Sequence, residues 1–188
     1  MYWWAKKRTV LAAWGLGIVL LTCYSCASDL TPSSTNRLQY ADLPAFFHGE
    51  VERLGQENPK VRKTVSAGED SELQDVMIND WSRELSSFLA IDLNKSVYRD
   101  DIRKDSVDHM VTYRIDNPDL DIETVVLKYD EESDSPVAIE IVRYIQNFLY
   151  DTQERLRYDK RKGYVIEKHQ SVWILGDNQY FIEGEFIQ

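Results

Sequence analysis

The sequence is poor in the residues that carry the commonest enzyme chemistry. It contains only two cysteines, both within the first 26 residues, and three histidines, His48, His109 and His169. None of the histidines stands in a metal-ligand spacing such as HExxH or HxH, so no metal site is predicted. No GxSxG or SxxK arrangement is present to activate a serine, and the eight glycines form no phosphate-binding loop. We therefore expect no cofactor and no enzyme activity.

A long hydrophobic run is missing as well. The longest apolar stretch, from Val10 to Leu21, is shorter than the roughly 20 residues that a membrane-spanning helix needs. Three basic residues precede this stretch, and Thr22-Cys23-Tyr24-Ser25-Cys26 follows it. A basic start and a short apolar run are typical of a secretory signal. The cysteines at its end indicate a lipobox rather than an ordinary cleavage site.

Residues 1–26 resemble the signals of bacterial lipoproteins. The resemblance implies that residues 1–25 form a lipoprotein signal peptide and that a cysteine is acylated and becomes the mature N-terminus. We favour Cys26 as the lipidation site, because the small Ser25 precedes it; Cys23, preceded by Thr22, is the alternative. An aspartate follows neither cysteine. The implied location is therefore the outer membrane of the cell envelope, with the domain in the periplasm or at the cell surface.

The charge of the chain restricts its partners. Removing residues 1–25 takes away three of the 22 basic residues and none of the 32 acidic ones, which leaves 19 against 32, a formal charge of −13. An acidic surface repels nucleic acid phosphates and anionic lipid headgroups. We therefore expect no nucleic acid partner, and contact with the membrane only through the N-terminal lipid anchor. Two cysteines in the lipobox also leave no disulfide framework.

The remaining chain is organised as a tether and one domain. Residues 26–38 are small and polar, as expected of a flexible tether, and residues 39–188 are long enough for a single globular domain. Asp42 is a good N-cap for a helix that carries Phe47 and Leu54 on one face and ends before Pro59. A second helix is predicted from its apolar face, which is formed by Trp81, Leu85, Phe88 and Leu89.

Alternating apolar and polar residues predict strands in the rest of the domain. We expect a hairpin over 61–67 and 73–78, and strands over 107–115, 122–129, 164–174 and 180–186. Residues 97–106 are predicted as a surface loop, residues 176–178 as a turn, and Gly184 as a bulge or a close backbone approach. Residues 136–158 fit two strands or one helix, and their β-branched and aromatic residues favour strands.

The predicted fold class follows from this order of elements. It is α+β, with two helices packed on one face of an antiparallel, mostly meander sheet of about 6–8 strands.

Two groups of side chains are candidates for function. Glu167, Glu183 and Glu185 would share one face of the sheet, where a solvated surface is a better interpretation than a catalytic carboxylate pair. Aromatic residues are dense between residues 144 and 186, and those not needed for the core would form a ligand or partner contact surface. The candidates are Trp173, Tyr150, Tyr164 and Tyr180. Trp173 would instead be shielded if it faced the second helix.

Three functions are considered. The preferred hypothesis is a lipid-anchored envelope protein without catalytic activity, serving as a protein-interaction or accessory subunit for an unidentified envelope protein partner. The alternative is a carrier of lipid or another apolar ligand, because helices over a curved antiparallel sheet on a lipoprotein resemble the half-barrel of lipoprotein-carrier proteins. A carboxylate-dependent envelope hydrolase is a more distant alternative.

Overall fold

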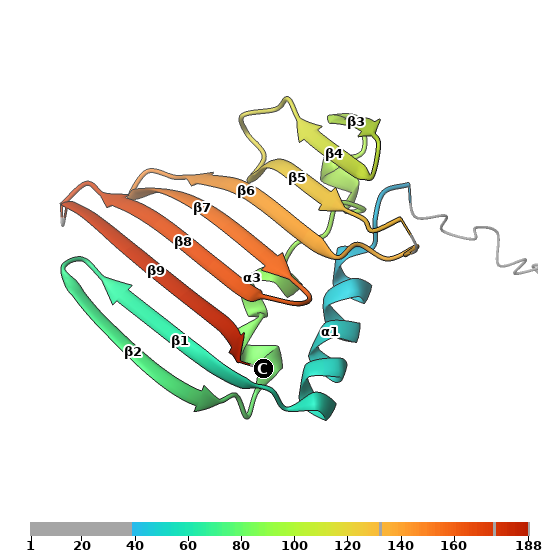
Figure 1. The fold of residues 1–188 in the computed structure, drawn as a ribbon. Helices are drawn as coiled ribbons and strands as arrows, with labels where there is room; N and C mark the ends of the chain where they lie inside the picture. Colours follow the sequence, from blue (N-terminus) through green and yellow to red (C-terminus); the bar gives the residue numbers. More distant parts are fainter. Residues whose placement is uncertain (1–38, 132, 175, 188) are drawn as a thin grey trace, which may run out of the picture. The chain divides into compact units, whose positions relative to one another are not determined.

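A computed structural model describes residues 39–131, 133–174 and 176–187. The predicted signal peptide, the tether and both cysteines lie outside these residues. The described chain forms one open antiparallel sheet of nine strands accompanied by short helices (Figure 1). The α+β class and the antiparallel sheet are thus confirmed. Within the described ranges, no helix combines the length and apolarity needed to cross a membrane.

The sheet is a meander with one rearrangement. Its strand order is β2-β1-β9-β8-β7-β6-β5-β4-β3, so β3 to β9 follow one another in space as they do in sequence. The hairpin of β1 and β2 joins this meander through the last strand, with Lys60 opposite Ile187 and Ala67 opposite Tyr180. The strands are β1 (Lys60–Ala67), β2 (Asp70–Met77), β3 (Ile102–Val107), β4 (Met110–Ile115), β5 (Ile122–Lys128), β6 (Ala138–Gln146), β7 (Tyr150–Asp159), β8 (Gly163–Val172) and β9 (Gly176–Ile187).

The first helix has the ends that the sequence predicts. In α1 (Leu43–Glu57), the Asp42 carboxylate accepts a hydrogen bond from the backbone N–H of Ala45 at 2.9 Å. This contact satisfies one of the backbone donors that a helix N-terminus leaves open. Asn58 adopts a left-handed conformation at the other end, directly before Pro59. The helix therefore stops where proline disfavours helical backbone in the preceding residue.

The helix and strand counts differ from the prediction. The second predicted helix is interrupted at Leu85, whose φ of −93° and ψ of 16° lie outside helical values, and it forms α2 (Trp81–Glu84) and α3 (Ser86–Leu89). A 3₁₀ helix, η2 (Ser96–Tyr98), follows. The predicted layer of two full helices is therefore wrong, because only α1 exceeds one turn. The sheet has nine strands rather than 6–8.

Three local predictions are also wrong. Residues 97–106 do not form a loop, since they contain part of η2 and most of β3. Residues 107–115 do not form one strand, because Asp108 has a φ of 50° and turns the chain between β3 and β4. The turn predicted over 176–178 lies earlier, since Asp177 and Asn178 pair with Ser171 and Gln170. By contrast, the two-strand interpretation of 136–158 is confirmed by β6 and β7.

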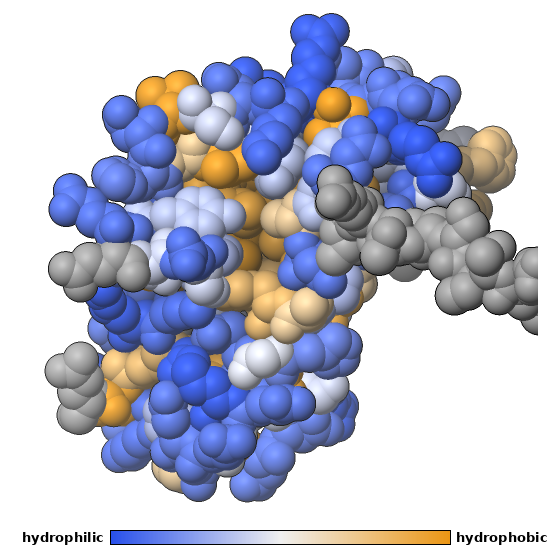
Figure 2. Space-filling view, turned by 90° about the vertical axis from the view of Figure 1, so that its right-hand side faces the viewer, coloured by the Kyte–Doolittle hydropathy of each residue, from blue (hydrophilic) through white to orange (hydrophobic). Residues whose placement is uncertain are grey.

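The helices and one face of the sheet form the core. Phe47 of α1 packs edge-on against Tyr158 of β7, with 5.5 Å between ring centroids, and Trp81 of α2 packs against Tyr164 of β8 at 6.5 Å. Figure 2, which views the side on which α1 lies, shows hydrophobic residues in the centre and hydrophilic residues around them. The core residues of the described part of the chain fall between residues 40 and 186. A chain that begins at Ala27 therefore retains every one of them.

A buried carboxylate ties α1 to β7. Glu50 is 5 % exposed, and its Oε2 accepts hydrogen bonds from Tyr158 Oη at 2.6 Å and Arg53 Nη2 at 2.7 Å. Lys160 Nζ lies 3.4 Å from its Oε1. Burial opposes the charge of Glu50, yet the hydrogen bonds from Arg53 and Tyr158 and the two nearby cations together hold its pKa below the ordinary value. The charged form is therefore the one that stabilises the fold.

Gly184 is closely approached by an aromatic side chain, whereas the sequence predicted a bulge or a close backbone approach. It lies opposite Tyr164 in the pairing of β8 and β9, and the register of this pair shows no bulge. The Tyr164 ring covers Gly184 so closely that a Cβ there would lie 2.3 Å from ring atoms. A glycine at this position lets the aromatic ring lie flat on the strand and reach the helices.

Candidate functional site

Among the described residues, the three most exposed apolar side chains lie together with Leu149 on two neighbouring loops. Phe148 and Leu149 lie between β6 and β7, and Trp173 and Ile174 lie between β8 and β9. Their exposed fractions are 86, 60, 79 and 83 %. The Phe148 and Trp173 rings pack edge-on at 6.2 Å, and the Trp173 backbone N–H donates to the Leu149 carbonyl at 3.3 Å. We call these four residues the apolar tip.

The four residues of the tip are of types that are uncommon in hairpin loops. Turns are usually built from Gly, Pro, Asn, Asp and Ser, because these residues favour turn geometry. In the first loop Asn147 supplies this chemistry, since its side-chain oxygen accepts from the backbone N–H groups of Leu149 and Tyr150. Gly176, with a φ of 82°, ends the second loop. The four apolar side chains are therefore not needed to form the turns, and they are presented to solvent.

The surroundings of the tip are acidic. From residue 144 to 152 and from 170 to 178 there is no Lys or Arg, and the charged residues are Asp151 and Asp177. Both aspartates lie beside Ser171 in the register of β7, β8 and β9, so they share one face of the sheet directly behind the tip. The tip is thus an apolar surface with a negatively charged border.

The predicted contact residues are distributed over the tip and the core. Trp173 belongs to the tip and does not face α2, so the alternative in which it is shielded by the second helix is wrong. Tyr150 begins β7 next to the tip, and Tyr180 is exposed on β9. Tyr164 is 2 % exposed, and its hydroxyl donates to Glu84, so it belongs to the core. Phe148, Leu149 and Ile174 were not among the predicted contacts.

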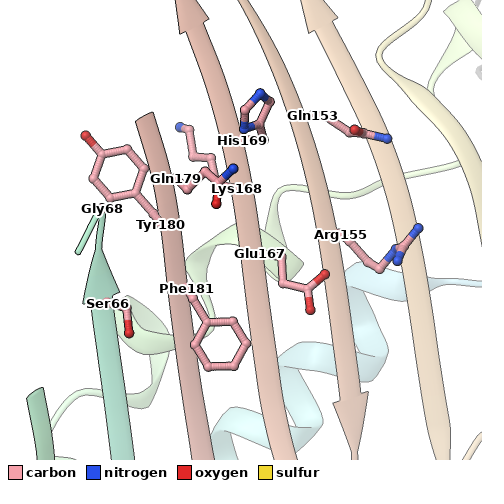
Figure 3. Close-up of a pocket in the computed structure, with 10 residues that line it drawn as sticks. All are labelled: Ser66, Gly68, Gln153, Arg155, Glu167, Lys168, His169, Gln179, Tyr180 and Phe181. Carbon is pink, nitrogen blue, oxygen red and sulfur yellow. The ribbon is translucent and has the colours of Figure 1, made fainter. Parts of the chain in front are cut away.

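A shallow pocket of about 380 Å³ lies on the face of the sheet opposite the helices (Figure 3). Arg155, Glu167 and Phe181 point into it from β7, β8 and β9. Glu167 is paired with Arg157. Glu183 and Glu185 share this face but lie opposite Val165 and Gly163, in rows other than that of Glu167. The three carboxylates therefore occupy one face, as predicted, without converging on one point.

The histidines are not brought together either. His48 lies on α1, His109 in the turn between β3 and β4, and His169 on β8. Across the described residues, no group of three His, Cys, Asp or Glu side chains could hold a metal ion.

A larger groove of about 860 Å³ lies on the helix-covered face, between α2, the end of β2, and strands β8 and β9. We call it the helix-side groove. Its lining combines apolar residues, including Ile166 and Ile182, with charged ones. Lys63 and Glu84 form an ion pair of 2.6 Å at its edge.

Comparisons with protein-family models, with curated proteins and with solved structures find no match to this chain. Its function is therefore argued from its own surfaces.

Proposed function

We propose that this protein is a lipid-anchored, non-catalytic subunit of the cell envelope that docks onto a partner protein through the apolar tip. The observation that supports this most directly is the position of Phe148, Leu149, Trp173 and Ile174 at two adjacent loops, exposed by 60 % or more. Places where a sequence breaks a local rule without benefit to the fold are expected to be functional. Contiguous exposed aromatic and aliphatic side chains are typical of binding sites.

The charge around the tip favours a protein over a lipid surface. Segments that insert into anionic membranes place Lys and Arg beside their apolar residues. The tip has Asp151 and Asp177 there instead, in a chain with an overall excess of acidic residues. The complementary surface is an apolar cleft with a basic border, because matched charges steer and orient association. A wholly apolar ligand has weaker support, since the helix-side groove carries ion pairs in its lining.

The docking proposal is tested with a double variant, Phe148→Ser/Trp173→Ser. Both side chains are exposed, so the free energy of unfolding should change by less than about 0.5 kcal/mol per site. If both are central contacts, each should contribute at least about 2 kcal/mol to binding, so each loss weakens the partner about 30-fold or more. Leu73→Ser is the matched control, because Leu73 on the edge strand β2 is also well exposed, at 62 %.

The experiment is cross-linking in intact cells from a photoreactive residue at position 174. We expect capture of one envelope protein, loss of capture in the double variant and normal capture in Leu73→Ser. Capture that survives the double variant, or that falls equally in Leu73→Ser, would exclude the tip as the docking surface.

The lipid anchor is tested separately. Cys26→Ser should abolish palmitate labelling and leave the precursor uncleaved. Labelling that is instead lost in Cys23→Ser would move the anchor to Cys23.

A further inference from the structure

One end of the helix-side groove holds an unusual arrangement of charges. Glu154 lines the groove and is 6 % exposed. Its Oε2 lies 2.7 Å from Arg143 Nε and its Oε1 lies 3.5 Å from Lys168 Nζ. Although Glu154 Oε2 and Arg143 Nε are close, neither makes a hydrogen bond of acceptable geometry. The pair is therefore held by charge, without the directional hydrogen bond that usually joins a buried carboxylate to a guanidinium.

The two cations share a single carboxylate. Among the described residues, Glu154 is the only acidic side chain within 4 Å of Arg143 or Lys168. The cluster therefore has a formal charge of +1, in a domain whose surface is strongly acidic. Lys168 is about one third exposed, and its ammonium has three N–H groups for one long contact. An anion beside Lys168 would accept a charge-assisted hydrogen bond from one of these N–H groups.

An apolar surface begins directly beside this cluster. Ile166 and Ile182 lie opposite each other on β8 and β9, two residues along each strand from the pair Lys168 and Tyr180 and therefore on the same face. Val76 and Ile78 also line the groove, and Met77 and Tyr180 stand exposed among the lining residues. The volume of about 860 Å³ falls within the range of sites for small molecules. Positive charge and apolar surface thus follow one another along one groove.

We infer that the helix-side groove binds a single-chain amphiphile with an anionic head, such as a fatty acid. The head accepts hydrogen bonds from Lys168, and the chain covers Ile166 and Ile182. A cationic head would meet the surplus positive charge, and a neutral head would leave that charge unbalanced. This site is separate from the apolar tip and does not depend on the docking function proposed above.

The test is calorimetric titration of the chain from Ala27 to Gln188 with octanoate, decanoate and dodecanoate below their micelle concentrations. We expect one site, with affinity rising about fourfold for each methylene, the equivalent of about 0.8 kcal/mol per buried CH₂. Dodecanol and dodecyltrimethylammonium should bind at least about tenfold more weakly than dodecanoate. Lys168→Gln should weaken dodecanoate by about tenfold, and Lys168→Arg should keep most of the affinity.

Two variants separate this site from other surfaces. Arg157→Gln removes a cation from the opposite face of the neighbouring strand β7 and should leave dodecanoate binding unchanged. Phe148→Ser/Trp173→Ser should also leave it unchanged; a loss there would place the ligand on the tip and overturn the inference without affecting the docking proposal. Equal binding of dodecanol and dodecanoate, full affinity in Lys168→Gln, or binding without a fixed stoichiometry near one would each overturn it as well.

Discussion

Replacing Gly184 by alanine should destabilise the domain through a single methyl group. The added Cβ would lie 2.3 Å from Cε1 and Cζ of Tyr164 and 2.5 Å from its Oη. The ring has little room to move, because Trp81 packs edge-on against it at 6.5 Å and its hydroxyl is bonded to Glu84. Overpacking a well-filled core costs about 1–3 kcal/mol, and we expect Gly184→Ala near the upper end.

The measurement is urea unfolding of the chain from Ala27 to Gln188, with Gly49→Ala as the matched control. Gly49 lies within α1, and a Cβ there would meet nothing within 4 Å. Alanine is favoured over glycine inside a helix by about 0.5–1 kcal/mol, so this variant should be more stable than the natural chain. The same substitution should therefore have opposite signs at the two positions.

A cost below about 0.5 kcal/mol for Gly184→Ala would refute the reasoning, because it would mean that Tyr164 can leave the strand without loss. The double variant Gly184→Ala/Tyr164→Leu provides a second check. If the clash with the ring is the cause, the two substitutions should be non-additive by more than about 0.5 kcal/mol.

Two further predictions concern Glu50 and the tryptophans. Because the pKa of Glu50 is lowered in the folded chain, its contribution is complete above the unfolded pKa near 4.5 and is lost as the pH falls through the folded value. Glu50→Gln should therefore lower the free energy of unfolding, measured in urea, by about 3 kcal/mol at pH 7 and by less at pH 3.5. A loss that does not depend on pH would contradict this. Trp81 is buried and Trp173 is exposed. Trp173→Phe should shift the fluorescence maximum to the blue, and Trp81→Phe should shift it to the red. The free energy of unfolding should fall by less than about 0.5 kcal/mol in Trp173→Phe. Blue-shifted emission from Trp173 in the Trp81→Phe variant would contradict the exposed tip.

The elements that could be predicted from the sequence are those with local signals. Asp42 caps the start of α1 and Pro59 marks its end, and each acts on backbone within one turn of its own position. From Ile122 onward, the alternation of apolar and polar residues shows which face of each strand is buried. Strand β3 gave no such signal. It is one of the two edge strands, and its Arg103, Lys104 and Asp105 are exposed on both faces, so burial imposes no alternation there.

The candidate site was predictable only in part. An excess of aromatic residues in the last 45 residues pointed to a contact surface, and Trp173, Tyr150 and Tyr180 are at least 36 % exposed. Aromatic density also placed Tyr164 with them, but density cannot show that Gly184 opens space for that ring beneath α2. Phe148, Leu149 and Ile174 were missed because a hydrophobic residue near a strand is first assigned to the strand. Their position in turns becomes visible only once the pairing of β6 with β7 and β8 with β9 is known.

The pairing of β1 with β9 has a consequence for how the chain reaches its folded state. The first hairpin has no neighbour in the sheet other than the last strand, and each residue of β1 pairs with a residue more than one hundred positions later in the chain. Contacts between distant parts of a chain form late, because a long loop must close before they are gained. The fold therefore cannot be completed until Gly176–Ile187 is synthesised and free. If the chain is exported to the envelope unfolded, this dependence delays folding until the carboxyl-terminal strand has crossed the membrane.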